Sequence, residues 1–123
     1  LYDKQGQYEQ ALENENKGLE IREQFYGDDH TETAASHYNI GLIHYHHGEY
    51  AKAIDSYLKA LSIYEDFYSK HHPFMTKLWM SIAKAYQAKG DHEKAQEFVN
   101  KATEVSNLHK IIERSGGTEN KFK

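Results

Sequence analysis

The sequence predicts an all-α protein, a right-handed α-solenoid built from antiparallel helix pairs. Three observations predict this fold. Gly6, Gly48 and Gly90 lie 42 residues apart, and each opens a segment of similar pattern, which is typical of stacked repeats that bury their apolar faces on one another. Between these glycines, apolar and small residues recur at spacings of three and four, as on one helical face. Proline occurs once, at Pro73, which suits long helices joined by short turns.

The repeat length divides the chain into one half repeat, two full repeats and a tail. The half repeat is expected to be a helix over residues 7–26, and the later helices to cover residues 31–47, 50–68, 73–89 and 92 to about 113. Gly48 and Gly90 are expected to end the first helix of each pair. Pro73 fits the first turn of a helix, where its missing N–H group costs nothing. By register, Leu1 and Tyr2 would belong to the last turn of a helix that begins earlier.

These boundaries give one repeat domain with a short extension. We expect the domain to cover residues 1–114, as a half repeat (1–27), a repeat (28–69) and a repeat with an extended last helix (70–114). Residues 115–123, which begin with a glycine pair and continue with polar residues, are expected to form a flexible tail.

Composition narrows the classes of function. The chain of 123 residues has no cysteine, a net charge of −4 and no basic stripe, which disfavours a thiolate zinc site and a nucleic-acid partner. No apolar run approaches the ~20 residues that cross a bilayer. No serine lies in a nucleophile elbow, and the histidines lack the spacing of a metal site. We therefore expect a cytoplasmic protein that is not an enzyme and needs no cofactor.

Two recurring features are interpreted as structural. Gly41 in one helix and Ala53 in the next are small, which lets the two helix axes approach closely. His30 and His72 recur at the repeat period, each at the end of a loop, which favours a role in the loop or in capping the following helix.

Three short patterns resemble the tetratricopeptide repeat family: Ile40-Gly41, Gly48-x-Tyr50 and Ala53-x-x-x-Tyr57-x-x-Ala60-Leu61. The usual period of that family is about 34 residues. The longer period here, together with the loop over residues 27–34, is similar to the variant found in kinesin light chains. The resemblance covers residue 1 to about residue 105, and it implies a protein-interaction module, an adaptor or scaffold that binds a protein or peptide.

The resemblance also implies a concave groove lined by the first helix of each pair. The residues expected to line it and to bind the partner are Tyr38, Asn39, Leu42, Tyr45, Lys77, Met80, Ser81 and Lys84, with His46 and Gln87 beside them. Asn39 is of particular interest because its amide can donate to and accept from a peptide backbone at once.

Other uses of the fold stay open at this stage. A clamp for a C-terminal carboxylate would match Asn39 and Lys77, but Ser81 stands where the family's clamp has arginine. The chain could instead be a structural segment that stacks within a larger assembly or associates with itself through its N-terminal end. It could also be a regulatory arm of a multidomain protein.

Overall fold

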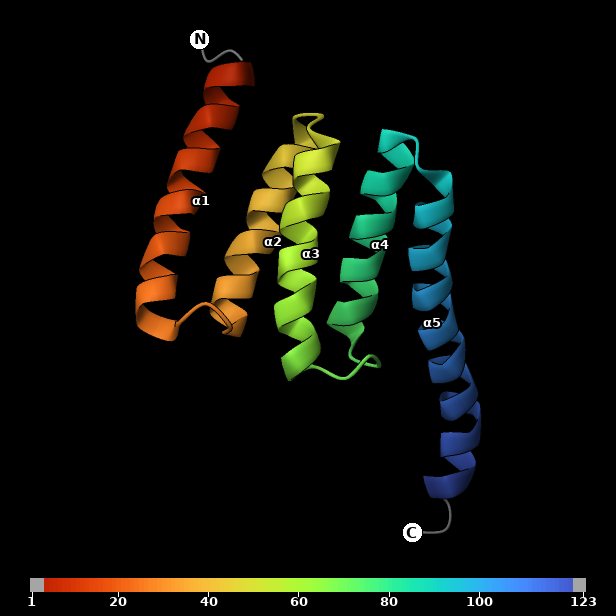
Figure 1. Cartoon of the computed structure of the whole chain (residues 1–123). Helices are drawn as coiled ribbons and strands as arrows, with labels where there is room; N and C mark the ends of the chain where they lie inside the picture. The colour runs from red at the N-terminus through yellow and green to blue at the C-terminus, as the bar shows by residue number, and fades with distance from the viewer. Residues whose placement is uncertain (1–3, 121–123) are drawn as a thin grey trace.

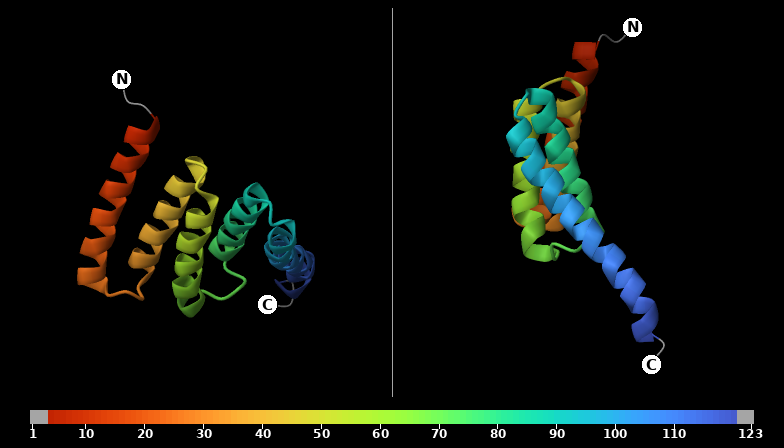
Figure 2. Two further views of the ribbon diagram at one scale, coloured as in Figure 1. Left: turned by 45° about the horizontal axis from the view of Figure 1, so that its top comes forward. Right: turned by 90° about the vertical axis from the view of Figure 1, so that its right-hand side faces the viewer.

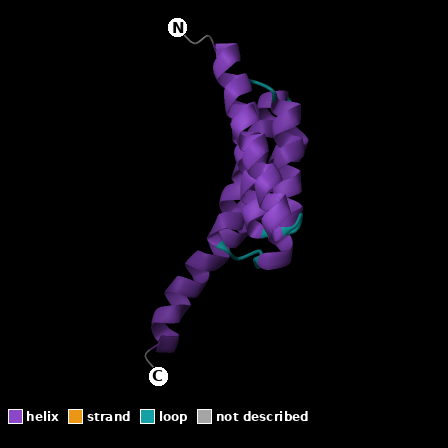
Figure 3. Cartoon of the chain, turned by 90° about the vertical axis from the view of Figure 1, so that its left-hand side faces the viewer, coloured by secondary structure: helices purple, strands orange, loops and turns teal. Residues whose placement is uncertain are grey.

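The computed structural model describes residues 4–120, and within them the chain forms five α-helices and no strand (Figure 1). The helices are α1 (Lys4–Tyr26), α2 (Thr31–His46), α3 (Tyr50–Phe67), α4 (Pro73–Lys89) and α5 (His92–Asn120). Each helix packs against the next helix along the chain. Successive helices run in opposite directions, joined by short loops (Figures 2 and 3). The predicted α-solenoid of antiparallel helix pairs is thus confirmed.

Glycine makes the tight turns between helices. Gly48 and Gly90 have φ angles of 85° and 99°, in the left-handed region that costs other residues a steric penalty. The Gly90 N–H group donates to the carbonyl of Tyr86 at 3.0 Å, which satisfies an otherwise free group at the end of α4. Gly48 and Gly90 therefore end the first helix of each pair, as the sequence predicts.

Gly6 differs from its two counterparts. It lies inside α1, which begins at Lys4 rather than at the predicted residue 7. A helix accommodates an interior glycine at a cost of about 1 kcal/mol, so the repeat pattern alone does not make it a terminator. The expectation for Leu1 and Tyr2 lies outside the described residues.

The last helix is longer than predicted. Instead of ending near Glu113, α5 continues to Asn120 and passes over Gly116 and Gly117. Residues 107–114 include several good helix formers, and neither glycine takes a positive φ that would close the helix. Residues 115–120 are thus helical, and only residues 121–123 of the expected tail lie outside the described part. The end of α5 extends away from the other helices (Figure 3).

The core lies where α3 and α4 meet their neighbours. Tyr57 of α3 is 1% exposed, and Leu78 of α4 is completely buried. The two helix pairs are linked here because α3 contacts both α2 and α4. Gly41 of α2 permits a close approach to α3, since its backbone lies against the Tyr57 ring. By contrast, α1 contributes no buried residue.

Histidine side chains cap two helices. The His30 Nδ1 atom accepts a hydrogen bond from the Glu32 backbone N–H group at 3.0 Å, at the start of α2. The His72 Nδ1 atom accepts from the Phe74 N–H group at 3.1 Å, at the start of α4. Each cap satisfies one of the free N–H groups in a first helical turn. The capping role that the repeat period favours is confirmed.

Replacing His72 with alanine should lower the free energy of unfolding by about 1 kcal/mol, because the Phe74 N–H group loses its acceptor. Asparagine, whose side-chain oxygen can accept the same bond, should restore most of that loss. Urea denaturation followed by circular dichroism measures both changes. Equal stability of the alanine variant and the natural chain would show that the cap contributes nothing.

Candidate functional site

The facing sides of α2 and α4 form a shallow pocket of about 300 Å³. Its lining includes seven of the eight residues that the sequence predicts for partner binding, and Asn39 is the exception. The pocket is lined by Tyr38, Leu42, Tyr45, His46, Tyr57, Lys77, Met80, Ser81 and Lys84. The helical register predicted from the repeat thus brings these side chains together, although whether they bind a partner is a separate question.

A hydrogen bond joins the two helices at one end of this pocket. The Ser81 hydroxyl donates to the Lys77 carbonyl of its own helix at 3.1 Å, so its oxygen is free to accept. The Tyr38 hydroxyl lies 3.2 Å from that oxygen and is therefore the donor. This pair of bonds fixes Tyr38 of α2 against α4, with its ring 5.5 Å from the Tyr57 ring.

A second pocket extends the first along α4. It has a volume of about 330 Å³ and shares Tyr45, Met80 and Lys84 with the first pocket. Its other lining residues are Ala83, Gln87, Ala88, Ala95 and Val99. Gln87, which the sequence places beside the groove, belongs to this second part. We refer to the two pockets together as the α2–α4 groove.

The groove combines an apolar floor with positive charge. Lys77 and Lys84 are exposed on α4, and no Asp or Glu is among the described residues that line either pocket. The chain as a whole carries a net charge of −4, so this local balance is opposite to that of the molecule. Such a surface favours a ligand with negative charge beside an apolar group.

Tyr57 lines this pocket although the sequence analysis did not place it on the groove. It has two roles, because its side chain is buried in the core while it also lines the groove. Burial raises the pKa of the Tyr57 hydroxyl, and Tyr38 and Tyr45 raise it further. The hydroxyl therefore stays protonated and available as a donor throughout the physiological range.

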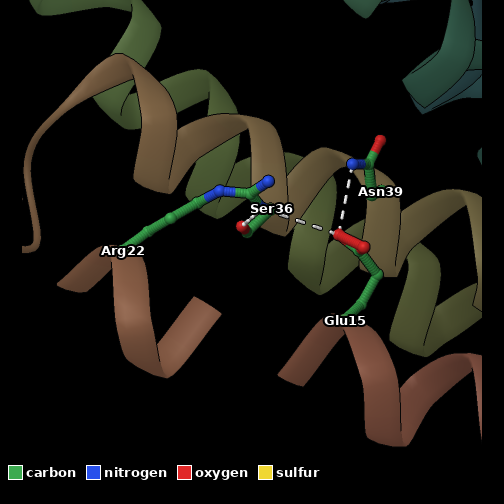
Figure 4. A network of polar contacts seen from close by, with 4 residues as sticks. All are labelled: Glu15, Arg22, Ser36 and Asn39. Atoms are coloured by element: carbon green, nitrogen blue, oxygen red, sulfur yellow. Dashed lines mark hydrogen bonds and ion pairs between the residues drawn. The ribbon is translucent and has the colours of Figure 1, made fainter. Parts of the chain in front are cut away.

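Asn39 faces α1 instead of the groove. Its Nδ2 atom donates to Glu15 Oε1 at 3.2 Å (Figure 4). The same carboxylate lies 3.9 Å from the Arg22 guanidinium, which also donates to the buried Ser36 hydroxyl. This network joins α1 to α2. The sequence contained no signal for it, because Glu15 and Arg22 belong to the half repeat and the register of α1 on α2 cannot be read from periodicity.

The outer side of the stack carries another pocket that the sequence did not indicate. It has a volume of about 340 Å³ and lies between α3, α5 and the loop before α4, with the indole of Trp79 at its base. Its lining is Glu65, Lys70, His71, Trp79, Lys101, Glu104, Val105 and Leu108. Both acidic and basic side chains line this pocket, whereas, among the described residues, lysines and no acidic residues line the α2–α4 groove.

The histidines do not assemble into a metal site within the described residues, where no three His, Asp or Glu side chains are placed to share an ion. His30 and His72 serve as helix caps. His44 is engaged by Tyr8 of α1. No helix among the described residues is both long and apolar enough to cross a membrane.

Stacked antiparallel helix pairs with a groove along their first helices define a helical repeat protein. The tetratricopeptide repeat family model matches residues 1–66 and residues 39–107. The chain therefore belongs to the tetratricopeptide repeat family, a class of non-catalytic repeat modules.

A solved structure supports the same fold. BtubC (BKLC) from P. vanneervenii, a kinesin light chain-like repeat protein, superposes with a TM-score of 0.77 at 20% sequence identity. The match covers 84% of this chain and 41% of BtubC, so this chain spans less than half the length of that relative. A search of curated proteins finds no match.

Proposed function

We propose that this chain is a protein-interaction module that binds a segment of another protein in the α2–α4 groove. Tetratricopeptide repeats generally mediate protein–protein interaction. The observation that carries the proposal is the joint lining of one pocket by Tyr38, Leu42 and Tyr45 of α2 with Lys77, Met80 and Lys84 of α4. In this proposal the groove is the concave face of the array, and the module acts as an adaptor or scaffold in the cytoplasm.

The chemistry of the groove supports a particular kind of segment. Tyr45 and Met80 are shared by both pockets, and they offer an apolar surface to a large side chain. Lys77 and Lys84 flank that surface, so a carboxylate next to the apolar side chain would find a positive partner. Aromatic side chains dominate the energetics of such interfaces, which makes Tyr45 the expected anchor.

Truncating this anchor should abolish capture of the partner. We expect the natural chain, immobilised and exposed to cell lysate, to retain a protein that the Tyr45→Ala, Lys84→Ala double variant loses. For the purified partner, calorimetry should show a loss of about 2 kcal/mol or more, roughly 30-fold in affinity, because an anchor and a charge contact are both removed.

The matched control is a Lys101→Ala variant, which removes a lysine from the outer pocket and leaves the groove intact. If the double variant still bound the partner and the Lys101→Ala variant did not, the binding site would lie in the outer pocket and not in the groove. Asn39→Ala completes the set, since Asn39 was predicted to bind the partner and instead contacts Glu15. An equal loss with this variant would extend the binding surface to α1.

A structural role is the second candidate, and one observation favours it. Phe25, Ile21 and Tyr26 are 83%, 57% and 51% exposed on α1, so this end of the stack presents apolar surface. A segment that stacks on further repeats or on a second copy would cover such a surface. Recovery of the chain alone from lysate, together with a concentration-dependent molecular mass, would support this candidate over partner binding.

A further inference from the structure

Tyr8 makes a distinctive contact between α1 and the end of α2. Its hydroxyl oxygen lies 2.8 Å from the Nδ1 atom of His44. Its ring stacks on the His47 ring, with centroids 3.7 Å apart and an angle of 10° between the planes. We call these three residues the Tyr8 contact. It joins residues that are 36 positions apart in the sequence, at the end of α1 opposite to the Gly27 turn.

This contact matters because α1 is the end helix of the array and packs mainly on α2. No residue of α1 is buried, so apolar packing contributes less here than in the α3–α4 core. Two further contacts to α2 are polar and come from Glu15 and Arg22. An end helix held in this way is expected to open locally before the rest of the array does.

The Tyr8 contact depends on the charge state of His44. In the neutral ring with the proton on Nε2, Nδ1 accepts a hydrogen bond from the Tyr8 hydroxyl. In the imidazolium both ring nitrogens donate, so that acceptor is lost. The positive charge of the imidazolium would also lie close to titratable groups of α1, of α3 and of the residues that follow α2.

These neighbours mostly oppose a positive charge. Lys52 of α3 faces His44, and His47 lies beside it on its own side. Among residues 4–120, Glu49 is the one carboxylate that faces the ring and favours its charged form. On the side of α1, Lys4 lines the same pocket as Tyr8, together with His46 and His47.

The electrostatic balance agrees with this geometry. Burial, Lys52 and His47 lower the pKa of His44 from its usual value of 6.5, against the effect of Glu49. A histidine whose pKa is lower in the docked state stabilises that state at neutral pH. This stabilisation falls as the pH decreases through the range between the usual and the lowered value.

We propose that the Tyr8 contact is a pH-sensitive attachment, which holds α1 on α2 while His44 is neutral and releases it when His44 becomes protonated. The pairs α2–α3 and α4–α5 stay folded through this change. Release of α1 separates Glu15 from Asn39 and Arg22 from Ser36, so it uncovers a polar face of α2. The array thus presents a different surface in a mildly acidic environment.

Hydrogen exchange measured by mass spectrometry on the full chain tests the proposal. Protection factors, corrected for intrinsic exchange rates, are compared at about pH 7.5 and about pH 5.5, on either side of the usual histidine range. We expect protection of the α1 amides to be lower at the acidic pH, by at most about tenfold, because pH 5.5 lies about one unit below the usual histidine pKa and each unit is worth tenfold in an equilibrium. Protection of the α4 amides should stay nearly constant.

A His44→Gln variant keeps a side chain that can accept from Tyr8 but cannot become charged, so it should remove the pH dependence of α1. His92→Gln, at the exposed start of α5, is the matched control and should behave as the natural chain does. Three results would overturn the proposal: constant protection of α1, unaltered pH dependence in His44→Gln, or an equal loss in α1 and α4. The last would indicate global unfolding, for which the half-buried His37 beside Lys59 is the alternative cause.

Discussion

Replacing Gly41 with leucine should lower the free energy of unfolding by about 3 kcal/mol or more, the upper range for overpacking a core. A Cβ atom at this position would lie 2.5 Å from Cδ1 and 2.6 Å from Cε1 of Tyr57. It would also lie 3.2 Å from the Ala53 carbonyl oxygen, which belongs to the backbone of α3. The Tyr57 ring is buried and cannot turn away into solvent, so α2 and α3 have to separate.

Gly18 provides the matched control for this experiment. It lies in α1, and a Cβ atom there would meet only the Arg22 Nη1 atom, at an ordinary 3.6 Å. Gly18→Leu should therefore leave the stability unchanged or raise it by up to about 1 kcal/mol, because leucine is the better helix former. Urea denaturation of both variants measures the difference. Similar stabilities for the two would mean that α2 and α3 are not in close contact at Gly41.

Replacing Leu78 with alanine should cost about 2–5 kcal/mol, the range for removing a large aliphatic side chain from a packed core. Leu78 has no exposed surface and lies on α4, in the cluster that also contains Trp79 and Ile82. The deletion leaves a cavity between the helix pairs, where few side chains can move in to fill it. Thermal and urea unfolding, followed at the single tryptophan, give the change in stability.

The same substitution at Leu108 isolates the effect of burial. Leu108 is 38% exposed on α5, so Leu108→Ala should cost less than about 1 kcal/mol. If both variants lost the same stability, the core would not be centred on α4. The difference between the two positions tests the fold itself, independently of any function.

The periodic part of the fold could be predicted from the sequence with little error. Pro73 and Lys89 bound α4 where predicted, and α2 and α3 each end one residue from the predicted position. Turn chemistry explains this success, because Gly48, Gly90 and Pro73 constrain the backbone directly. The α5 terminus was predicted less well, since Gly116 and Gly117 disfavour a helix only weakly and do not forbid it.

The candidate site also has one part that could be predicted from the sequence and one part that could not. The resemblance to the repeat family placed Tyr38, Tyr45 and Lys84 on the groove by register, and the pocket contains all of them. Asn39 is one position from Tyr38, yet it faces α1 and bonds to Glu15. Its direction depends on how α1 lies across α2, and no local pattern encodes that arrangement. That Tyr38, Tyr45 and Lys84 bind a partner stays a prediction until such a partner is identified.

The packing of each helix on its sequence neighbour also bears on how the chain folds. Such contacts close short loops, so the relative contact order is low, and helical proteins of this kind fold within microseconds to milliseconds. In a linear array, folding can nucleate in one unit and propagate to those beside it. The closely packed pairs α2–α3 and α4–α5 are the natural nuclei here, and α1, which contributes no buried residue, is expected to join last. A nascent chain could therefore assemble its second and third units before its first unit is secure.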